Sequence, residues 1–401
     1  MTTTLRLGIA GAGIAALQVL PHLAALDERI ALAALADVRR ENMEFFCERY
    51  GRPVPMYDSV EAMCASRDVD AVWVASPNAL HAEHTILAAR HGKHVICEKP
   101  MAVSLEACAA MVEAVERHGI RFVQGHSKAY DTPIRKMAEI LAGGELGRVI
   151  HIQTWNWNDW LLRALVQSEV DTAQGSRVVF RQGPHQADIV RFLGGGLVRS
   201  VRAVAGRRDP DFPDCEGNYT AFLEFEDGAA ATMVFDGYGY FDVAELTWGI
   251  GESGRRMRNP DSVLPRARPG GPIPAEAKYA MVRAGNPYGY GTGGGIDESS
   301  PRRNPFFGLT IVSCERGVLR QHPDGITIYG AQGRREIAVE SHRGRSSELL
   351  ELHEAVTANR PTLLDARWGM ASTEVCLAIL QSSRERREVL LKHQVRACHK
   401  S

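Results

Sequence analysis

Two absences in the 401-residue sequence exclude broad classes of function. Neither sign of charge is in excess, because 47 Lys and Arg face 48 Asp and Glu, for a formal net charge of −1. A protein that binds nucleic acid or an anionic membrane through its charge carries a basic surplus. No apolar run reaches the roughly 18 residues that a membrane-spanning helix requires. We therefore expect no nucleic-acid partner and no membrane partner.

Cysteine is sparse and unpatterned. The eight cysteines include no C-x-x-C pair, which argues against a zinc site and a redox motif. Scattered thiols in a chain of this length are typical of a reducing compartment. The apolar segment 7–26 contains Gln18, Pro21 and His22, unlike a secretory signal peptide. The sequence therefore predicts a cytoplasmic protein with no disulfide framework and no metal.

Lysine is the scarcest charged residue. Only seven of the 47 basic residues are Lys and 40 are Arg, an imbalance for which coding bias is the simplest explanation. Each lysine can nevertheless be judged by its own position. Lys99 is the one that stands between a predicted strand and a proline, in the sequence Glu-Lys-Pro.

A glycine-containing turn follows the first predicted strand. Residues 5–10 read as a strand, 11–16 read Gly-Ala-Gly-Ile-Ala-Ala, and a helical pattern continues to about Leu26. A second predicted strand, 30–36, precedes Asp37. This is the order of a dinucleotide-binding βαβ unit, with a glycine for the tight turn and another for close approach to a pyrophosphate. The cofactor contacts predicted here are Gly11, Ala12, Gly13, Ile14, Ala15 and Asp37.

Asp37 favours NAD over NADP. A carboxylate at the end of the second strand accepts hydrogen bonds from the adenosine ribose and repels a 2′-phosphate. Arg39 and Arg40 keep NADP open as the less favoured alternative, because either guanidinium could pair with that phosphate. Both arginines are explained equally well as solvated residues at a helix start.

Strands and helices alternate through the rest of the first third. Strands are predicted at 71–75, 94–97 and 121–124, and the helices between them at 79–91 and 104–118. This alternation predicts an α/β fold with a doubly wound parallel sheet, whose ligands bind beyond the carboxyl ends of the strands. The loops 76–78 and 98–100 lie at such ends. We expect further cofactor contacts from Ser76, Asn78, His81, Glu98 and Lys99.

These motifs resemble the Gfo/Idh/MocA family of nicotinamide-dependent oxidoreductases. The resemblance is carried by AVWVASPNALHAEHTILAARHGKHVICEKPMA at 71–102, GGELGR at 143–148 and GPHQAD at 183–188. It implies that Lys99 stands beside the nicotinamide. It also implies that His185 is catalytic, with Asp188 three residues later. The family usually has an Asp four residues before that histidine, where this chain has Arg181.

Two further stretches, 171–203 and 301–330, resemble the phthalate cis-4,5-dihydrodiol dehydrogenases of aromatic-compound catabolism within this family. The resemblance implies an NAD-dependent oxidation of a cyclic cis-diol bearing carboxylates to a catechol. Arg181 suits such a substrate, because a guanidinium binds a carboxylate that an Asp would repel. The residues predicted to bind substrate are Arg181, His126, Arg177 and Asp188. Arg177, Arg302 and Arg303 are explained at least as readily as surface arginines, and His126 equally well as a structural buried histidine.

The resemblance assigns Lys99 and His185 to one hydroxyl group. A histidine titrates near neutral pH and suits the role of base, whereas Lys99 would orient and polarise the oxygen. The reverse assignment stays open. Two alternatives for the whole protein also stay open: a sugar, inositol or glycoside oxidoreductase of the same family, and an NAD-binding regulatory protein without catalysis.

The remainder of the chain predicts a second domain. Strands at 149–157, 198–205, 218–226 and 229–238, with a helix at 183–193, indicate a C-terminal α+β domain with a largely antiparallel sheet. Two helices, 347–359 and 368–387, close the chain. We predict a dinucleotide-binding domain over 1–125 and a substrate-binding and oligomerisation domain over 126–401. An open sheet face of this kind favours a homodimer or homotetramer.

Two local features of the second domain lack an assigned role. Residues 251–305 contain 10 Gly and 8 Pro in 55 positions, which predicts a long loop that acts as a lid or as an arm to another subunit. Trp155 and Trp157 share one face of a predicted strand, most simply as sheet packing. Trp160 falls in the loop beyond and could line a pocket for a flat ring.

Overall fold

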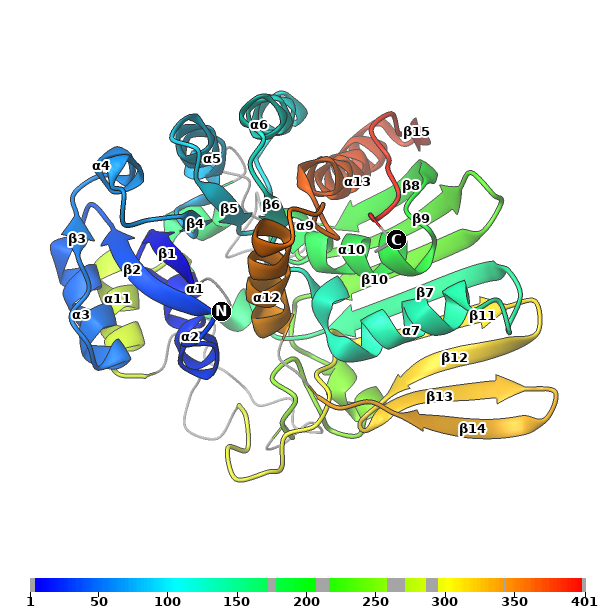
Figure 1. Ribbon diagram of the computed structural model, residues 1–401. Coiled ribbons are helices and arrows are strands. Elements are labelled where there is room, and N and C mark those ends of the chain that lie inside the picture. The colour runs from blue at the N-terminus through cyan, green and yellow to red at the C-terminus, as the bar shows by residue number, and fades with distance from the viewer. Residues whose placement is uncertain are drawn as a thin grey trace. The chain divides into compact units, whose positions relative to one another are not determined.

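The computed structural model describes residues 4–171, 178–206, 216–257, 271–285, 295–341 and 344–398. They form two units, coloured along the chain in Figure 1. The first unit takes its residues from 1–127, 343–373 and 397–401, and the second from 128–342 and 374–396. The predicted division, which assigned everything after residue 125 to one domain, therefore differs from the structure at residues 343–373, which return to the first unit.

The first unit contains a six-stranded sheet of order β3-β2-β1-β4-β5-β6. All its strands are parallel, as the sequence predicts, and the short strand β3 was not predicted. Its strands are β1 (Leu5–Ala10), β2 (Ile30–Ala36), β3 (Met56–Tyr57), β4 (Ala71–Val74), β5 (His94–Cys97) and β6 (Phe122–Gln124). The residues of β4 are all buried, because helices cover both faces of the sheet.

Helices cover the two faces of this sheet. Figure 1 shows α4 (Val60–Ala65), α5 (His81–Arg90) and α6 (Leu105–His118) on one face, and α2 (Leu20–Ala25) with α12 (Gly344–Thr357) on the other. The remaining helices are α1 (Ile14–Leu17) and α3 (Arg40–Tyr50). The helix predicted from residue 14 to about Leu26 is two helices, α1 and α2. Pro21, which has no N–H to donate, stands in the first turn of α2, where a new helix tolerates it.

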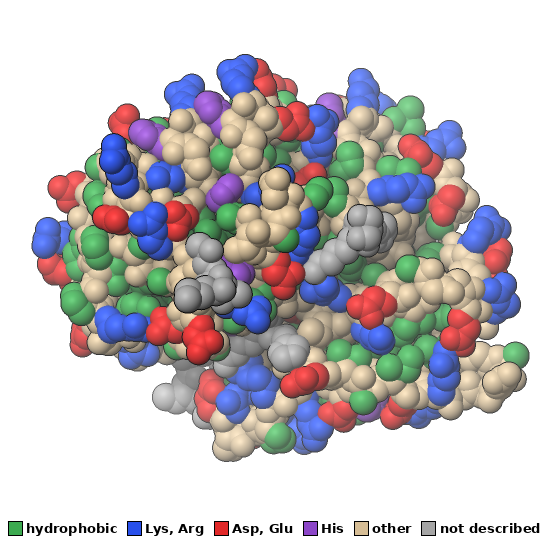
Figure 2. Space-filling model, viewed as in Figure 1, with side chains coloured by type: hydrophobic (Ala, Val, Ile, Leu, Met, Phe, Trp, Pro, Cys, Tyr) green, Lys and Arg blue, Asp and Glu red, His purple; other side chains and the backbone are tan. Residues whose placement is uncertain are grey.

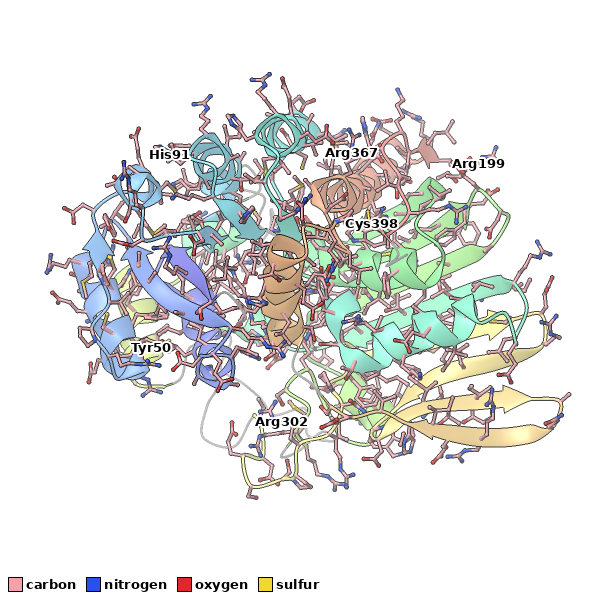
Figure 3. The ribbon with its side chains drawn as sticks, in the orientation of Figure 1. Tyr50, His91, Arg199, Arg302, Arg367 and Cys398 are labelled. Atoms are coloured by element: carbon pink, nitrogen blue, oxygen red, sulfur yellow. The ribbon has the colours of Figure 1, made fainter. Side chains whose placement is uncertain are left out.

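α12 explains why residues 343–373 belong to the first unit. This helix contacts β5, β6 and α2, so it covers a part of the sheet whose strands lie more than 200 residues earlier in the chain. A helical pattern identifies an apolar face but not the sheet against which that face packs. Arg367, labelled in Figure 3, pairs with Glu116 at 2.6 Å and ties the start of α13 (Ala366–Glu385) to α6.

The second unit contains a nine-stranded sheet of order β14-β13-β12-β11-β7-β10-β9-β8-β15. Only β7 and β10 pair in parallel, so the predicted largely antiparallel sheet is confirmed. The strands are β7 (Val149–Trp157), β8 (Val198–Gly206), β9 (Asn218–Phe225), β10 (Ala230–Asp236), β11 (Leu309–Cys314), β12 (Gly317–His322), β13 (Gly325–Gly330), β14 (Gly333–Ala338) and β15 (Val389–Leu390).

Helices pack on one face of this sheet. α7 (Thr132–Ala142) contacts β12 and β13, and α10 (Gly183–Leu193) contacts β7 and β10. Shorter helices of the unit are η2 (Lys128–Tyr130), α8 (Gln167–Val170), α9 (Val178–Arg181) and α11 (Ala275–Arg283). The helix-facing residues of β9 and β10 are buried, whereas Phe222 and Val204 on the opposite face are 46% and 63% exposed. The sheet therefore keeps an apolar open face.

The described part of the chain has no helix long and apolar enough to cross a membrane. It also has no group of three His, Cys, Asp or Glu side chains arranged to hold a metal ion. On the face shown in Figure 2, basic and acidic side chains are interspersed, in keeping with the balanced totals of the sequence.

Candidate active site

The carboxyl ends of four parallel strands lie in register in the first unit. Ala10 pairs with Val74, Val74 with Cys97, and Cys97 with Gln124. The loops that follow these strands therefore begin along one edge of the sheet. Those loops carry most of the predicted cofactor residues, which are Gly11, Ala12, Gly13, Ser76, Asn78, Glu98 and Lys99, and also His126, which was predicted to bind substrate.

The two glycines of the first loop serve different purposes. Gly11 has φ +94°, and a Cβ there would lie 2.8 Å from the Ala75 carbonyl oxygen. Only glycine fits this position, because the backbone is left-handed and the next strand end is too close. Gly13 has an ordinary negative φ, and a Cβ there would meet no atom of the chain within 4 Å. The open space above Gly13 is suited to a phosphate group.

Asp37 closes the same loop. Its carboxylate accepts hydrogen bonds from the backbone N–H groups of Ala12 and Arg39, each at 2.8 Å. The side chain therefore fixes the glycine turn, and the residue remains half-buried at the end of β2. The Arg39 guanidinium lies 3.9 Å from Glu41, and the Arg40 guanidinium 3.0 Å from Glu44. Both arginines thus have a carboxylate partner on α3.

His81 has a different position from the one that the sequence predicts. Its ring is buried, with Nε2 2.9 Å from the Ser76 carbonyl oxygen and Nδ1 2.8 Å from the Pro100 carbonyl oxygen. Burial lowers the pKa of His81 although both carbonyls oppose that shift. The prediction of a direct cofactor contact is therefore corrected: His81 links the loop after β4 to the loop after β5. His84 adds a second link through its Nδ1, 2.9 Å from the Ser76 hydroxyl.

A buried ion pair stands next to Lys99. The Glu98 and Arg345 side chains are each 8% exposed and hydrogen-bonded to one another. Burial alone would raise the pKa of Glu98, but the Arg345 guanidinium and the Lys99 ammonium outweigh it and lower that pKa. Arg345 also donates to the Gln18 amide oxygen at 3.2 Å and lies over the Trp73 ring. Lys99 itself is half-buried at the following position.

His126 is held between two carboxylates in the loop after β6. Its backbone N–H donates to Glu98 at 3.3 Å, and its ring Nδ1 lies 3.1 Å from Glu348 on α12. Glu348 also accepts a hydrogen bond from the backbone N–H of Ser127 at 2.7 Å. A Cβ at Gly125 would lie 3.1 Å from that carboxylate, so the glycine leaves room for Glu348. The His126 side chain is 16% exposed.

In the second unit, His185 lies in the first turn of α10 and is 5% exposed. Its ring meets the Phe307 ring edge-on, with centroids 4.7 Å apart. The next residue, Gln186, donates hydrogen bonds to Thr154 on β7 and to the Val234 carbonyl on β10. These bonds hold the first turn of α10 on the sheet. Asp188 is buried on the same helix at 2% exposure.

Arg181 is already paired in the structure. Its guanidinium donates to Glu169 at 2.6 Å, and the same carboxylate lies 3.6 Å from the Lys278 ammonium. Lys278 also donates to the Ala164 carbonyl oxygen. Arg181 therefore belongs to a cluster that joins α9 and α8 to α11. The predicted Arg177 lies outside the described residues.

Other predicted substrate or pocket residues have local partners. Arg302, labelled in Figure 3, donates to the Ser253 carbonyl oxygen, and Arg303 pairs with Asp324. Both arginines are exposed. The Trp155 and Trp157 rings meet at 6.2 Å on one face of β7, in agreement with sheet packing. Trp160 is 3% exposed and belongs to the core of the unit.

The segment predicted as a long loop is partly structured. α11 lies within it, and the Ile273 N–H donates to the Leu165 carbonyl oxygen at 2.8 Å. With the Lys278 contacts, this bond attaches residues 271–285 to the segment 164–170 of the same chain. Residues 258–270 and 286–294, including most of the glycine tract, lie outside the described residues.

Comparisons with known proteins agree with this architecture. Residues 5–126 match the model of the oxidoreductase family with an NAD-binding Rossmann fold, and residues 134–242 match the GFO/IDH/MocA C-terminal domain. A 1-carboxy-3-chloro-3,4-dihydroxycyclohexa-1,5-diene dehydrogenase from Comamonas testosteroni is 30% identical over 393 residues, 95% of each chain. The chain belongs to the Gfo/Idh/MocA family of oxidoreductases.

Two further proteins are similar to this chain. A putative dehydrogenase from Bordetella bronchiseptica RB50 has a crystal structure that superposes with a TM-score of 0.84, at 33% identity, covering 97% of this chain and all of that one. An inositol 2-dehydrogenase from Serratia proteamaculans is 27% identical over 270 residues, which are 66% of this chain and 77% of that protein. The predicted family and fold class are therefore confirmed.

Several polar residues near the site were not predicted. Arg345 and Glu348 come from α12, more than 200 residues after the loops that they contact. Asn156 lies on β7 in an otherwise ordinary strand, and Lys128 follows the predicted His126 by two residues. The scarcity of lysine was the one signal that could have singled out Lys128, because it too is one of seven.

Proposed function

We propose that this protein is an NAD-dependent dehydrogenase that oxidises a carboxylated cis-dihydrodiol to the corresponding catechol. The observation that carries the proposal is the full-length likeness to the Comamonas testosteroni enzyme, whose name describes a carboxylated dihydroxycyclohexadiene. The catalytic candidates of the family, Lys99 and His185, are both present in this chain. This combination favours a catalyst over a regulatory protein that only binds NAD.

The first unit fits a nicotinamide dinucleotide. The space above Gly13 accepts a pyrophosphate, and the half-buried Asp37 carboxylate faces the loop in which an adenosine ribose would lie. Arg39 and Arg40 already have carboxylate partners on α3, which reduces their value as ligands of a 2′-phosphate. These observations support NAD as the cofactor, with NADP as the less favoured alternative.

The chemistry assigned to the chain's own residues is proton transfer and charge stabilisation. A bound nicotinamide would supply the acceptor for a hydride from the ring carbon that bears the hydroxyl. His185 accepts the hydroxyl proton as that C–H bond breaks, and Lys99 stabilises the charge that develops on the oxygen. The carbinol becomes a ketone, and the ring then loses a proton from carbon and gains one on oxygen to become a catechol. Aromatisation makes the reaction effectively one-way.

An inositol or sugar dehydrogenase is the second candidate, favoured by the inositol-dehydrogenase relatives of the chain. Arg181 argues against it, because the family pattern that the sequence resembles has an Asp at that position. The cluster of Arg181, Glu169 and Lys278 carries one net positive charge, which favours an anionic substrate in the second unit without a direct contact from Arg181.

A substrate panel tests the proposal. NADH formation is followed by absorbance with 3,4-dihydroxycyclohexa-1,5-diene-1-carboxylate, its phthalate-derived dicarboxylate analogue, inositol and hexoses, each with NAD and with NADP. The proposal expects turnover of the carboxylated dihydrodiols with NAD. Turnover of inositol or hexoses without turnover of any dihydrodiol would contradict it.

We also propose a cytoplasmic homo-oligomer, dimer or tetramer, that contacts its copies through the open face of the nine-stranded sheet. Phe222 and Val204 lie on that face, as do Trp155, Leu309 and Tyr329 by strand register. A row of partly exposed apolar side chains on a wide sheet is typical of an interface.

A further inference from the structure

Lys128 is buried at the start of the second unit. Its side chain is 8% exposed, in η2, the turn that leads into α7. The other lysine buried to this degree in the described part of the chain is Lys278, which hydrogen-bonds to the Ala164 carbonyl oxygen and lies near Glu169. A buried ammonium group needs such partners, because it has given up its hydration.

The partners of Lys128 on the chain are comparatively remote. Its ion-pair partner is Asp131, whose carboxylate oxygen lies 4.0 Å from the Lys128 Nζ, beyond hydrogen-bond distance. The ammonium also lies over the Phe307 ring, 5.8 Å from its centroid. A cation in this position can approach a second anion more closely than it approaches Asp131.

Phe307 connects Lys128 to the candidate base. The same ring that lies under the ammonium meets the His185 ring at 4.7 Å. The two polar groups therefore flank one aromatic side chain. A flat ring substrate whose hydroxyl reaches His185 could thus present a substituent to Lys128.

A second observation points to a ligand at this place. The Asn156 side chain is 1% exposed, and its Nδ2 has no hydrogen-bond partner among the residues that the structure describes. Asn156 stands against Gly308, the neighbour of Phe307, where a Cβ on the glycine would lie 3.0 Å from the Asn156 Cβ. Buried donors are almost always satisfied, so this amide is suited to an acceptor that binds beside Phe307.

Arg181 lacks these features. Its guanidinium forms a short ion pair with Glu169, which also neutralises Lys278 of α11. The residue is 25% exposed and joins three segments of the unit. These contacts hold α11 against α8 and α9.

We propose that Lys128, together with the Asn156 amide, binds the carboxylate of the ring substrate, and that Arg181 fastens α11 instead. The inference rests on the proposed function, since it assumes a carboxylated ring whose hydroxyl is oxidised at His185. A carboxylate oxygen accepts from the Lys128 ammonium and from Asn156 Nδ2, and Phe307 packs against the ring. Lys128 is thus a determinant of substrate specificity, and selects anionic dihydrodiols over neutral ones.

The test compares two substrates that differ only in the carboxylate: 3,4-dihydroxycyclohexa-1,5-diene-1-carboxylate and the unsubstituted cis-dihydrodiol of benzene. Lys128→Met keeps an unbranched side chain of nearly the same length and removes its charge. We expect it to raise KM for the carboxylated substrate by roughly 10- to 100-fold, the value of a charge-assisted contact, with a much smaller effect on the neutral one. Asn156→Leu should also raise KM for the carboxylated substrate relative to KM for the neutral one. Lys136→Met is the matched control, because Lys136 pairs with Glu139 on α7. It should change KM for neither substrate.

Equal losses with both substrates in the Lys128→Met and Asn156→Leu variants would overturn the inference, since a merely structural lysine would act in that way. A selective loss in Arg181→Met without one in Lys128→Met would overturn it too. Equilibrium binding of 3,4-dihydroxybenzoate and catechol, the two products, repeats the comparison without turnover. If the wild-type protein oxidised neither dihydrodiol, the proposed function would fail, and this binding ratio would still decide whether Lys128 recognises a carboxylate.

Discussion

Gly11 and Gly13 belong to one motif but meet different physical demands. Gly11 is required by the fold, because its backbone is left-handed and touches Ala75. Gly13 is not required by the fold, because nothing on the chain fills the space beside it, and we propose that a bound pyrophosphate requires it. The usual interpretation of a glycine motif does not separate these two demands, whereas the structure does.

We predict that Gly11→Ala and Gly13→Ala have opposite signatures. Gly11→Ala should lower the free energy of unfolding by about 1–3 kcal/mol, because the new methyl group meets the backbone in a strained conformation. Gly13→Ala should leave that free energy within about 0.5 kcal/mol of wild type and weaken NAD binding instead. Denaturant unfolding and cofactor titration measure the two effects. Unchanged NAD affinity in Gly13→Ala would exclude a pyrophosphate at this turn.

Lys99 is predicted to act in the chemical step. Lys99→Met should lower kcat by about 10²- to 10⁴-fold, the usual worth of a positioned proton-transfer or charge-stabilising group. The unfolding transition should stay near wild type, because Lys99 is half-buried and follows the ion pair rather than forming it. A kcat within a few-fold of wild type would remove Lys99 from the catalytic centre.

At the scale of elements, α12 fixes the loop that carries Lys99. Arg345 binds Glu98, and Glu348 one turn later accepts hydrogen bonds from the loop after β6. One helix thus holds two strand-end loops of the first unit.

We predict that Arg345→Met destabilises the protein by about 3–5 kcal/mol near neutral pH, since it leaves Glu98 buried and uncompensated. The pKa of Glu98 is lowered in the folded wild type, so the ion pair contributes fully above the ordinary value of 4.5 and its contribution is lost as pH falls below that value. In Arg345→Met, burial favours the protonated form of Glu98. The difference in the free energy of unfolding between the variant and the wild type should therefore become smaller as the pH falls. Unfolding free energies measured from neutral pH to about pH 4 test this trend.

Glu98→Gln in the Arg345→Met background is the control. It removes the buried Glu98 charge that Arg345 no longer compensates, and should recover part of the lost stability. The two single variants and the double variant together form a double-mutant cycle. The ion pair would not be the cause of the lost stability if the effects of Glu98→Gln and Arg345→Met on the free energy of unfolding were simply additive and the destabilisation by Arg345→Met did not depend on pH.

The elements differ in how well the sequence predicts them. β2, β5, β7 and α10 lie at the predicted bounds, because continuous apolar runs and clear turn residues delimit them. β11–β14 were not predicted as strands. For β14 the reason is its composition, because most of its residues are charged and exposed. α12 was predicted as a helix but assigned to the wrong unit, because its partners are Glu98 and the loop after β6.

The residues of the candidate site also differ in how well the sequence predicts them. Gly11, Gly13, Asp37 and Lys99 are found in the loops that the sequence predicts, since local motifs specify them. The roles of His81 and Arg181 follow from contacts with Pro100 and Glu169, and no local pattern reports such contacts. Long-range pairing is what sequence patterns alone leave undetermined.

At the scale of the whole molecule, the open sheet face is predicted to determine the oligomeric state. Phe222→Asp places a charge among apolar residues of that face and should shift the protein toward the monomer, as measured by light scattering after gel filtration. Val38→Asp, at a 93% exposed position of the first unit, is the control and should leave the mass unchanged. An unchanged mass in Phe222→Asp, for a protein that is oligomeric in its wild-type form, would place the interface elsewhere.

We propose above that this oxidoreductase converts a carboxylated cis-dihydrodiol into a catechol with NAD. The most direct measurement is the yield of both products from 3,4-dihydroxycyclohexa-1,5-diene-1-carboxylate, with NADH followed by absorbance and 3,4-dihydroxybenzoate by chromatography. We predict that the two form in equal amounts, that the reaction runs to completion, and that Lys99→Met abolishes both. The absence of NADH and of 3,4-dihydroxybenzoate with wild-type protein, under conditions in which NAD binds, would contradict the proposed function.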